Sequence, residues 1–249
     1  MKVVYHERYK EVYSRDPAAR AGRIETIYDE LYGRFEFIKP VPANEEDLRL
    51  VHTQSHIDSI RRRKLYDNAL LAVGGAIKAS ELAMEGEPAF GLIRPPGHHA
   101  SPSSCWGFCF LNNAAISIEK LRKEGKVKRA FIVDIDLHYG DGTANIFASN
   151  PEVSYYHMPG GSREEQLKRL PDYLAGKKGY EILALSAGFD RHEEDWGGVL
   201  KTRDYEDIGK MIRDFTEKEC DGRRYAVLEG GYNHQVLGKN VKAFLKGMS

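Results

Sequence analysis

The alternation of short apolar runs with helical patterns constrains the fold of this chain more than any other sequence feature. The runs are rich in Val, Ile, Leu, Phe and Tyr, as buried strands are. We expect strands at residues 2–5, 35–38, 89–93, 129–136, 153–157, 181–186 and 225–230, and helices near 20–32, 44–63, 68–85, 112–124, 143–149, 163–175, 202–219 and 236–246. Strands that alternate with helices form βαβ units. The sequence therefore predicts an α/β fold with a central, mostly parallel sheet covered by helices on both faces.

The length and punctuation of the chain favour one domain. The 249 residues suit a single large α/β domain, and no linker, repeat or low-complexity tract divides them. We therefore expect a single domain over residues 1–249. Thr202 is the predicted N-cap of the helix that follows it, and Gly86 and Gly125 are the predicted ends of two helices.

Charge and cysteine content exclude several classes of protein. Lys plus Arg and Asp plus Glu both number 37, so nothing favours a nucleic acid or an anionic membrane as partner. The basic run "SIRRRK" (59–64) is best interpreted as a solvated helix face. Three cysteines without a CxxC pair indicate a reducing compartment. The N-terminus lacks an apolar signal-like stretch and no run of 18 apolar residues exists, so we expect a soluble, cytoplasmic protein.

Ligands of parallel sheets bind beyond the carboxyl ends of the strands, and polar residues collect there in this sequence. Asp134, Asp136 and His138 end the 129–136 strand, where alternation would direct them to one side. Burying two acids and a histidine is costly unless they bind a metal or pair with each other. Asp190 follows the 181–186 strand. Together, Asp136, His138 and Asp190 make the open three-ligand set that catalytic zinc uses, with His192 as a lower-ranked alternative ligand.

Two further strand ends carry candidate chemistry. In "RPPGHHA" (94–100), two prolines build a stiff corner, Gly97 is free to adopt a positive φ, and His98 and His99 follow. The histidine pair alone fits acid–base work, metal ligation or buried polar filler. In "LEGGYN" (228–233), two glycines permit a sharp turn before Tyr232, which is either an ordinary loop residue or a phenol donor to an oxyanion.

Five segments resemble, in order, the histone deacetylase and acetylpolyamine amidohydrolase family of the arginase/deacetylase fold. They are "RPPGHHA", "GFCFLNNAA" (107–115), "DIDLHYGDGT" (134–143), "SAGFD" (186–190) and "LEGGYN". Upstream segments look like the family's N-terminal helices, so the resemblance covers nearly the whole chain. It implies a zinc-dependent amidohydrolase that converts the N-acetyl amide of a lysine side chain or polyamine into acetate and free amine.

The resemblance also implies residue roles. Asp136, His138 and Asp190 would hold the zinc ion. His98 and His99 would be the tandem catalytic histidines, oriented by Asp134 and Asp141 respectively, and Tyr232 would polarise the substrate carbonyl. An oxygen-rich ligand set is also compatible with Fe²⁺, Co²⁺ or Mn²⁺.

Two departures from the family concern the substrate tunnel and a second cation. Gly107 and Phe108 would form one wall of the tunnel, but the chain passes from "VSYYHMPGGS" almost at once into "REEQLKRL", where the family carries a longer loop with a second aromatic wall. That wall would be absent or supplied by Trp196. Family members also bind a monovalent cation, usually K⁺, which here would use Asp134, Asp136, His138, Tyr155 and Tyr156. Tyr155 stands where many relatives have serine.

Several alternatives stay open. An arginase- or agmatinase-like ureohydrolase would need two metals, but "SAGFDRHEEDW" lacks the second ligand set. A non-catalytic protein that binds acetylated ligands would not need the complete set of polar residues. The loop acids Glu193, Glu194 and Asp195 either meet the distant ammonium of a polyamine or are solvated. These residues do not decide between a polyamine and a protein lysine as substrate.

Overall fold

The sheet predicted from the apolar runs is present in the computed structural model, which describes residues 1–249. Its strands run in the order β2-β1-β3-β7-β6-β4-β5, and every neighbouring pair is parallel. The strands are β1 (Lys2–Val4), β2 (Glu36–Ile38), β3 (Ala89–Gly91), β4 (Ala130–Asp134), β5 (Val153–His157), β6 (Ile182–Ala187) and β7 (Arg224–Leu228). The predicted α/β fold with a parallel sheet is confirmed.

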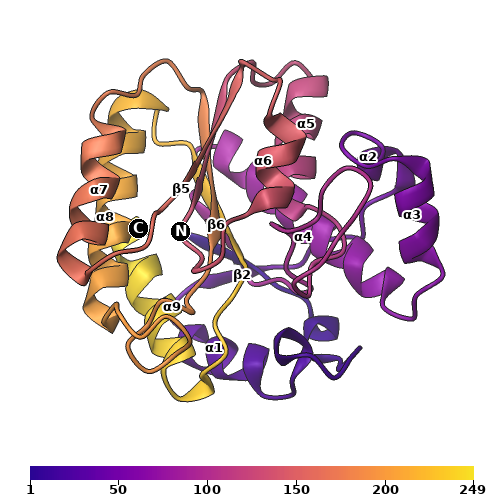
Figure 1. Ribbon diagram of the computed structural model, residues 1–249, viewed down its shortest axis with the longest axis horizontal. Coiled ribbons are helices and arrows are strands. Elements are labelled where there is room, and N and C mark those ends of the chain that lie inside the picture. Colours follow the sequence, from indigo (N-terminus) through magenta and orange to yellow (C-terminus); the bar gives the residue numbers. More distant parts are fainter.

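Helices cover both faces of the sheet, as predicted. One layer holds α1 (Arg23–Leu31), α7 (Arg163–Leu174), α8 (Thr202–Glu219) and α9 (His234–Met248), and the other holds α4 (Tyr66–Met84), α5 (Asn113–Lys123) and α6 (Asp141–Phe147) (Figure 1). Two short 3₁₀ helices, Glu7–Lys10 and Pro17–Ala19, lie before α1. No helix combines the length and the apolar character needed to cross a lipid bilayer.

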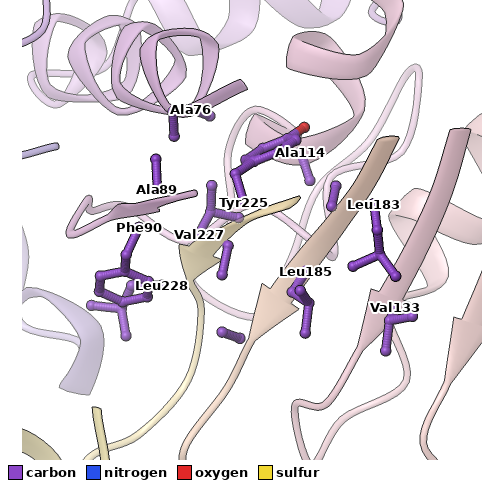
Figure 2. Close-up of a cluster of buried hydrophobic side chains, with 14 of the residues drawn as sticks. Ala76, Ala89, Phe90, Ala114, Val133, Leu183, Leu185, Tyr225, Val227 and Leu228 are labelled. Carbon is purple, nitrogen blue, oxygen red and sulfur yellow. The ribbon is translucent and has the colours of Figure 1, made fainter. Parts of the chain in front are cut away.

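The core lies between the sheet and the two helical layers. Figure 2 shows Ala89 directed toward Ala76 of α4 and Tyr225 directed toward Ala114 of α5, whereas Phe90 and Leu228 point to the opposite face. Every residue of β4, β6 and β7 is buried because helices cover both faces. This explains why these strands are continuous apolar runs without the alternation of a half-exposed strand.

The single helix predicted over 44–63 is wrong: the segment forms two short helices, α2 (Glu45–Leu48) and α3 (Gln54–Arg61). They lie at the right of Figure 1, outside the two layers. Thr53 caps α3 by accepting a hydrogen bond from His56 N. Between the helices, the buried His52 ring donates from Nδ1 to Ser101 O (3.0 Å) and accepts from Asn112 N (2.9 Å). These long-range contacts keep the residues between α2 and α3 from continuing the helix.

The predicted helix boundaries are mostly confirmed. Gly86 and Gly125 follow the last residues of α4 and α5 with φ of 83° and 69°. Thr202, however, is the first residue of α8 and not its N-cap, which is Lys201. The Thr202 hydroxyl donates instead to Asn240 Oδ1 of α9 at 2.7 Å, so it joins two helices.

Glycines allow α8 and α9 to pack closely, and this contact can be tested. A Cβ on Gly209 would lie 2.4 Å from Phe244 O, a backbone atom that cannot move aside. We expect Gly209→Ala to lower the free energy of unfolding by about 1–3 kcal/mol in urea titrations, because overpacking forces the helices apart. Gly176→Ala is the matched control, since no atom lies within 4 Å of its added Cβ. Equal stability of the two variants would contradict this view of the helix pair.

The His52 ring makes stability depend on pH. Burial, together with the neighbouring His56, lowers the pKa of His52 from 6.5 to about 3. The folded chain thus binds fewer protons than the unfolded chain, and the stability that neutral His52 provides above pH 6.5 is lost as the pH falls toward 3. We expect the stability advantage of the wild type over His52→Gln to shrink by about 2–3 kcal/mol between pH 7 and pH 4.5. An advantage that is the same at both pH values would show that His52 is not held neutral.

Candidate active site

Four neighbouring strands deliver the polar residues of the site to one edge of the sheet. In the order β3, β7, β6 and β4, these strands lie side by side, and their carboxyl ends meet at the same edge because all are parallel. The candidate residues follow these strands directly: His98 and His99 after β3, Tyr232 after β7, Asp190 after β6, and Asp136 and His138 after β4.

The end of β4 is shaped by its own carboxylates. The strand was predicted to run to residue 136, which is wrong, because β4 ends at Asp134. Asp134 Oδ1 accepts a hydrogen bond from Asp136 N at 3.0 Å, and Asp136 Oδ1 accepts one from His138 N at 2.9 Å. Such contacts between an aspartate and the amide two residues on turn the backbone. The turns keep Asp136 and His138 at the sheet edge.

Asp136, His138 and Asp190 form a compact cluster whose ligand atoms all lie within 4.8 Å of one another. His138 Nδ1 is 3.2 Å from Asp136 Oδ1 and 3.1 Å from Asp190 Oδ2. Asp190 Oδ2 is buried and accepts no hydrogen bond, since the His138 contact lacks hydrogen-bond geometry. His192, the alternative ligand, lies apart and accepts from Glu194 N at 3.1 Å.

The electrostatics of this cluster fit a cation. Burial and the charge of Asp136 raise the pKa of Asp190 to about 6. The close carboxylates of Asp136 and Asp190 raise the pKa of His138 to about 10. Both shifts express the same fact: two buried carboxylates repel each other and attract positive charge. A divalent ion bound by one histidine nitrogen and two carboxylates would satisfy the unpaired oxygen and offset this repulsion.

The tandem histidines have opposite electrostatic environments although their rings are only 4.0 Å apart. His98 Nδ1 lies 3.0 Å from Asp134 Oδ2, and His99 Nδ1 lies 2.7 Å from Asp141 Oδ1. Burial disfavours charge on His98, but the carboxylates of Asp136 and Asp134 raise its pKa well above the usual range. Burial and the neighbouring His98 lower the pKa of His99 to about 4. At neutral pH the pair therefore holds one cationic and one neutral ring.

The corner before the histidines differs from the prediction. Gly97 does not adopt a positive φ, and the bond between Arg94 and Pro95 is cis. Glycine is required for close approach instead, because a Cβ at residue 97 would lie 2.6 Å from Leu111 O. The buried Glu229, which sequence reasoning missed, accepts from Gly97 N at 2.7 Å and from His98 N at 3.2 Å. This carboxylate ties the corner to the end of β7.

A second group of potential ligands, His98, Cys109 and Glu229, lies beside the first. Burial raises the pKa of the Cys109 thiol far above its usual range, which disfavours the thiolate that metals bind. Glu229 is already engaged with the corner. The aspartate-rich cluster is therefore the better candidate for a metal site.

A cavity of about 130 Å³ lies above the histidines and is lined by aromatic side chains. The predicted substrate-binding residues Gly107, Phe108 and Trp196 all line it, together with Tyr232. Trp196 stacks on Tyr232 with ring centroids 4.1 Å apart, and the Phe108 ring lies 6.1 Å from the same tyrosine. Phe108 and Trp196 thus flank Tyr232.

Trp106 is a site residue that sequence reasoning missed. Its ring lies 3.9 Å from the His99 ring, and its Nε1 donates to Asp141 Oδ2 at 2.9 Å. The side chain is 55% exposed and therefore forms part of the cavity rim. In the sequence, only its position directly before the motif "GFCF" indicated that it could belong to the site.

The loop that carries Tyr232 is held by two charged residues. Asp195 Oδ2 accepts hydrogen bonds from Tyr232 N and Asn233 N, each at 2.8 Å. Arg23 Nε donates to Gly231 O at 2.8 Å, and its guanidinium lies 5.5 Å from the centre of the Tyr232 ring. Asp195, one of the predicted mouth acids, is therefore committed to positioning this loop. The role of Arg23 depends on contacts distant in sequence and was not predicted.

Protein groups already contact several of the residues predicted for a monovalent cation. The Tyr155 hydroxyl donates to Asp134 Oδ2 at 2.8 Å, and the Tyr156 ring stacks on Tyr173. Asp136 O accepts from Arg191 Nη2 at 2.8 Å and lies 3.0 Å from His157 Nε2. Protein donors therefore already engage the Asp136 carbonyl and a carboxylate oxygen of Asp134, two of the oxygens that the ion would need.

These features define an α/β protein with a candidate metal and acid–base site at the carboxyl edge of its sheet. Residues 16–160 and 175–248 match the histone deacetylase domain family. The chain is 34% identical to a probable deacetylase of Archaeoglobus fulgidus, over 93% of this chain and 81% of the relative. It is 30% identical to a probable deacetylase of Methanothermobacter thermautotrophicus, over 85% of this chain and 78% of that one. The chain belongs to the histone deacetylase domain family.

A solved structure supports the fold. The crystal structure of the HDA15 HD domain matches with a TM-score of 0.83 and 24% identity, over 99% of this chain and 90% of that one. The family match leaves out residues 161–174, which include all of α7.

The backbone beside the cluster offers a test of the metal site. A Cβ on Gly188 would lie 2.1 Å from Asp136 Oδ2 and would displace that carboxylate. We expect Gly188→Ala to weaken binding of a divalent ion about 10–100-fold, the loss typical when the surroundings of a ligand are disturbed. Equilibrium dialysis against Zn²⁺ measures this, with Gly160→Ala as control because no atom lies within 4 Å of its added Cβ. Unchanged affinity in a folded Gly188→Ala protein would place the ion elsewhere.

Proposed function

We propose that the protein is a zinc-dependent deacetylase that hydrolyses the N-acetyl amide of a primary amine carried on a flexible aliphatic chain. Its membership of the histone deacetylase family supports the deacetylase class. One observation carries the proposal: His138 of the metal cluster, the histidine pair and Tyr232 line one small cavity. Asp136, His138 and Asp190 would hold the ion, which when bound would acidify a water molecule and polarise the acyl carbonyl.

His99 is the proposed general base and acid. Its low pKa leaves it neutral, and the contact of Nδ1 with Asp141 leaves Nε2 as the nitrogen that can accept a proton. The same nitrogen would later protonate the departing amine. Trp106 covers the His99 ring and shares Asp141 with it, so the imidazole is held in one orientation.

His98 and Tyr232 would stabilise negative charge. His98 carries a proton because Asp134 and Asp136 raise its pKa, so it offers a fixed positive charge beside the reacting centre. Burial raises the pKa of Tyr232 far above its usual range, so the phenol stays protonated and can donate to an oxyanion. Asp195 and Arg23 would fix the position of this phenol through the loop backbone.

The cavity supports an acyl group on a slender chain. Gly107, Phe108 and Trp196 would contact that chain, and a volume of about 130 Å³ leaves no room for a bulky amine near the metal. Of the loop acids, Asp195 accepts hydrogen bonds from the Tyr232 loop, and Glu193 lies 3.8 Å from Lys201 Nζ. Of the three loop acids, only the exposed Glu194 is left to meet a distant ammonium, and lysine side chains and polyamines are both tested below.

The test is acetate release by Zn²⁺-loaded protein from an acetyl-lysine peptide and from acetylated polyamines, measured separately. We expect turnover on at least one substrate, loss of turnover after chelation, and recovery when Zn²⁺ is restored. Tyr232→Phe should lower kcat about 10²–10³-fold, the cost of removing one oxyanion donor. Tyr32→Phe, at a tyrosine that is 66% exposed, should retain full activity.

Other outcomes distinguish the alternatives. About two metal ions per chain together with urea release from a guanidino substrate would instead support a ureohydrolase. Binding of acetylated amines without acetate release would support a ligand-binding protein. Full activity of Tyr232→Phe would remove the oxyanion role from that residue while leaving the deacetylase class intact.

A further inference from the structure

A buried arginine lies directly beneath the candidate metal site. Arg191 follows the ligand Asp190 and is only 1% exposed. Its guanidinium donates to three backbone carbonyls: Ile135 O (3.0 Å from Nε), Asp136 O (2.8 Å from Nη2) and Met158 O. The first two carbonyls belong to the turns after β4, and the third follows β5. One side chain thus gathers the oxygens of two neighbouring strand ends.

This location calls for positive charge. Asp134, Asp136 and Asp190 are all at most 1% exposed, and a divalent ion with a cationic His98 would balance their three negative charges. The converging carbonyl oxygens still need donors or a cation of their own. Clusters of backbone carbonyl oxygens bind K⁺ in proteins because they replace its hydration shell. In this chain the N–H groups of Arg191 donate hydrogen bonds to such a cluster of carbonyl oxygens.

We propose that Arg191 is a built-in monovalent cation, which takes the place of a potassium ion beneath the metal site and makes this protein independent of potassium. The inference deepens the proposed function, since it assigns the cation requirement of the same site. Arg191 would act through Asp136 and the turns after β4, so it is a positioning residue and not a catalytic one.

The segment after β5 supports this assignment independently. Gln166 of α7 is 2% exposed and accepts a hydrogen bond from Arg191 Nη1 at 2.9 Å. Residues 161–174, which include Gln166, lie outside the part of the chain that matches the family. The partner that holds the guanidinium therefore comes from a segment that the family model does not match. The Arg191 guanidinium and the Gln166 side chain that accepts from it therefore form one structural unit.

The wild-type protein provides the first test. Its melting temperature and its kcat/KM should be the same in KCl, NaCl and choline chloride at equal ionic strength. A saturable rise of either quantity with K⁺, absent with Na⁺, would overturn the proposal. The melting temperature needs no substrate, so this arm is decisive even if the protein releases no acetate and the proposed function fails.

Arg191→Ala provides the second test, because it removes the charge and leaves the carbonyl oxygens facing open space. We expect a lower melting temperature in NaCl and a rise of about 3–6 °C when K⁺ is present at roughly ten times its dissociation constant. kcat/KM should recover with K⁺ in the same concentration range. A general packing defect would not be corrected selectively by one cation.

Arg191→Lys is the matched control. It keeps the charge but loses the planar fork of donors, so it should be less stable than wild type and still insensitive to K⁺. A folded Arg191→Ala protein that responds equally to K⁺ and Na⁺ would overturn the proposal, as would a K⁺ requirement in Arg191→Lys equal to that of Arg191→Ala. If Arg191→Ala folds only in K⁺, the proposal is supported. If Arg191→Ala folds in neither salt, the salt dependence of the wild-type protein and of Arg191→Lys decides the question.

Discussion

The burial of four carboxylates at one edge of the sheet is the constraint on which the rest of the site depends. Asp134, Asp136, Asp190 and Glu229 are each no more than 1% exposed. An uncompensated buried charge costs several kcal/mol, so the surrounding chain must supply donors and cations. Backbone amides serve Asp134, Asp136 and Glu229, and His98 lies between two of these acids. The unpaired oxygen of Asp190 is left for a metal ion. The chemistry of the site thus follows from how its negative charge is balanced.

The same constraint explains the glycines of the strand-end motifs. A Cβ at Gly188 or Gly230 would lie 2.1 Å or 2.5 Å from Asp136 Oδ2, and one at Gly140 would lie 2.4 Å from Asp134 Oδ2. The backbone of neighbouring strand ends therefore packs directly on the carboxylates and excludes water from them. Of these three glycines none has a positive φ, so close approach, not backbone conformation, requires them.

Features that depend on local pattern could be predicted from the sequence, and features that depend on distant contacts could not. The seven strands follow from continuous apolar runs, and the cluster of Asp136, His138 and Asp190 follows from the rule that parallel strands end together. The break between α2 and α3 was missed because the His52 ring is held by Ser101 and Asn112. Arg191 was missed for the same reason, since an arginine after a turn acid is ordinarily a solvated residue.

Two departures from the family pattern have a common structural origin. The short segment after β5 turns at once into α7, so the Met158 carbonyl and the Gln166 side chain both reach the Arg191 guanidinium. The longer family loop expected there would have carried the second aromatic wall of the tunnel. Trp196, stacked on Tyr232, and Trp106, tilted against the His99 ring, form the exposed rim of the cavity. The course of the chain after β5 therefore bears on the lower end of the site, where it supplies two acceptors to the proposed internal cation. At the upper end, the rim consists of tryptophans that also contact two of the proposed catalytic side chains.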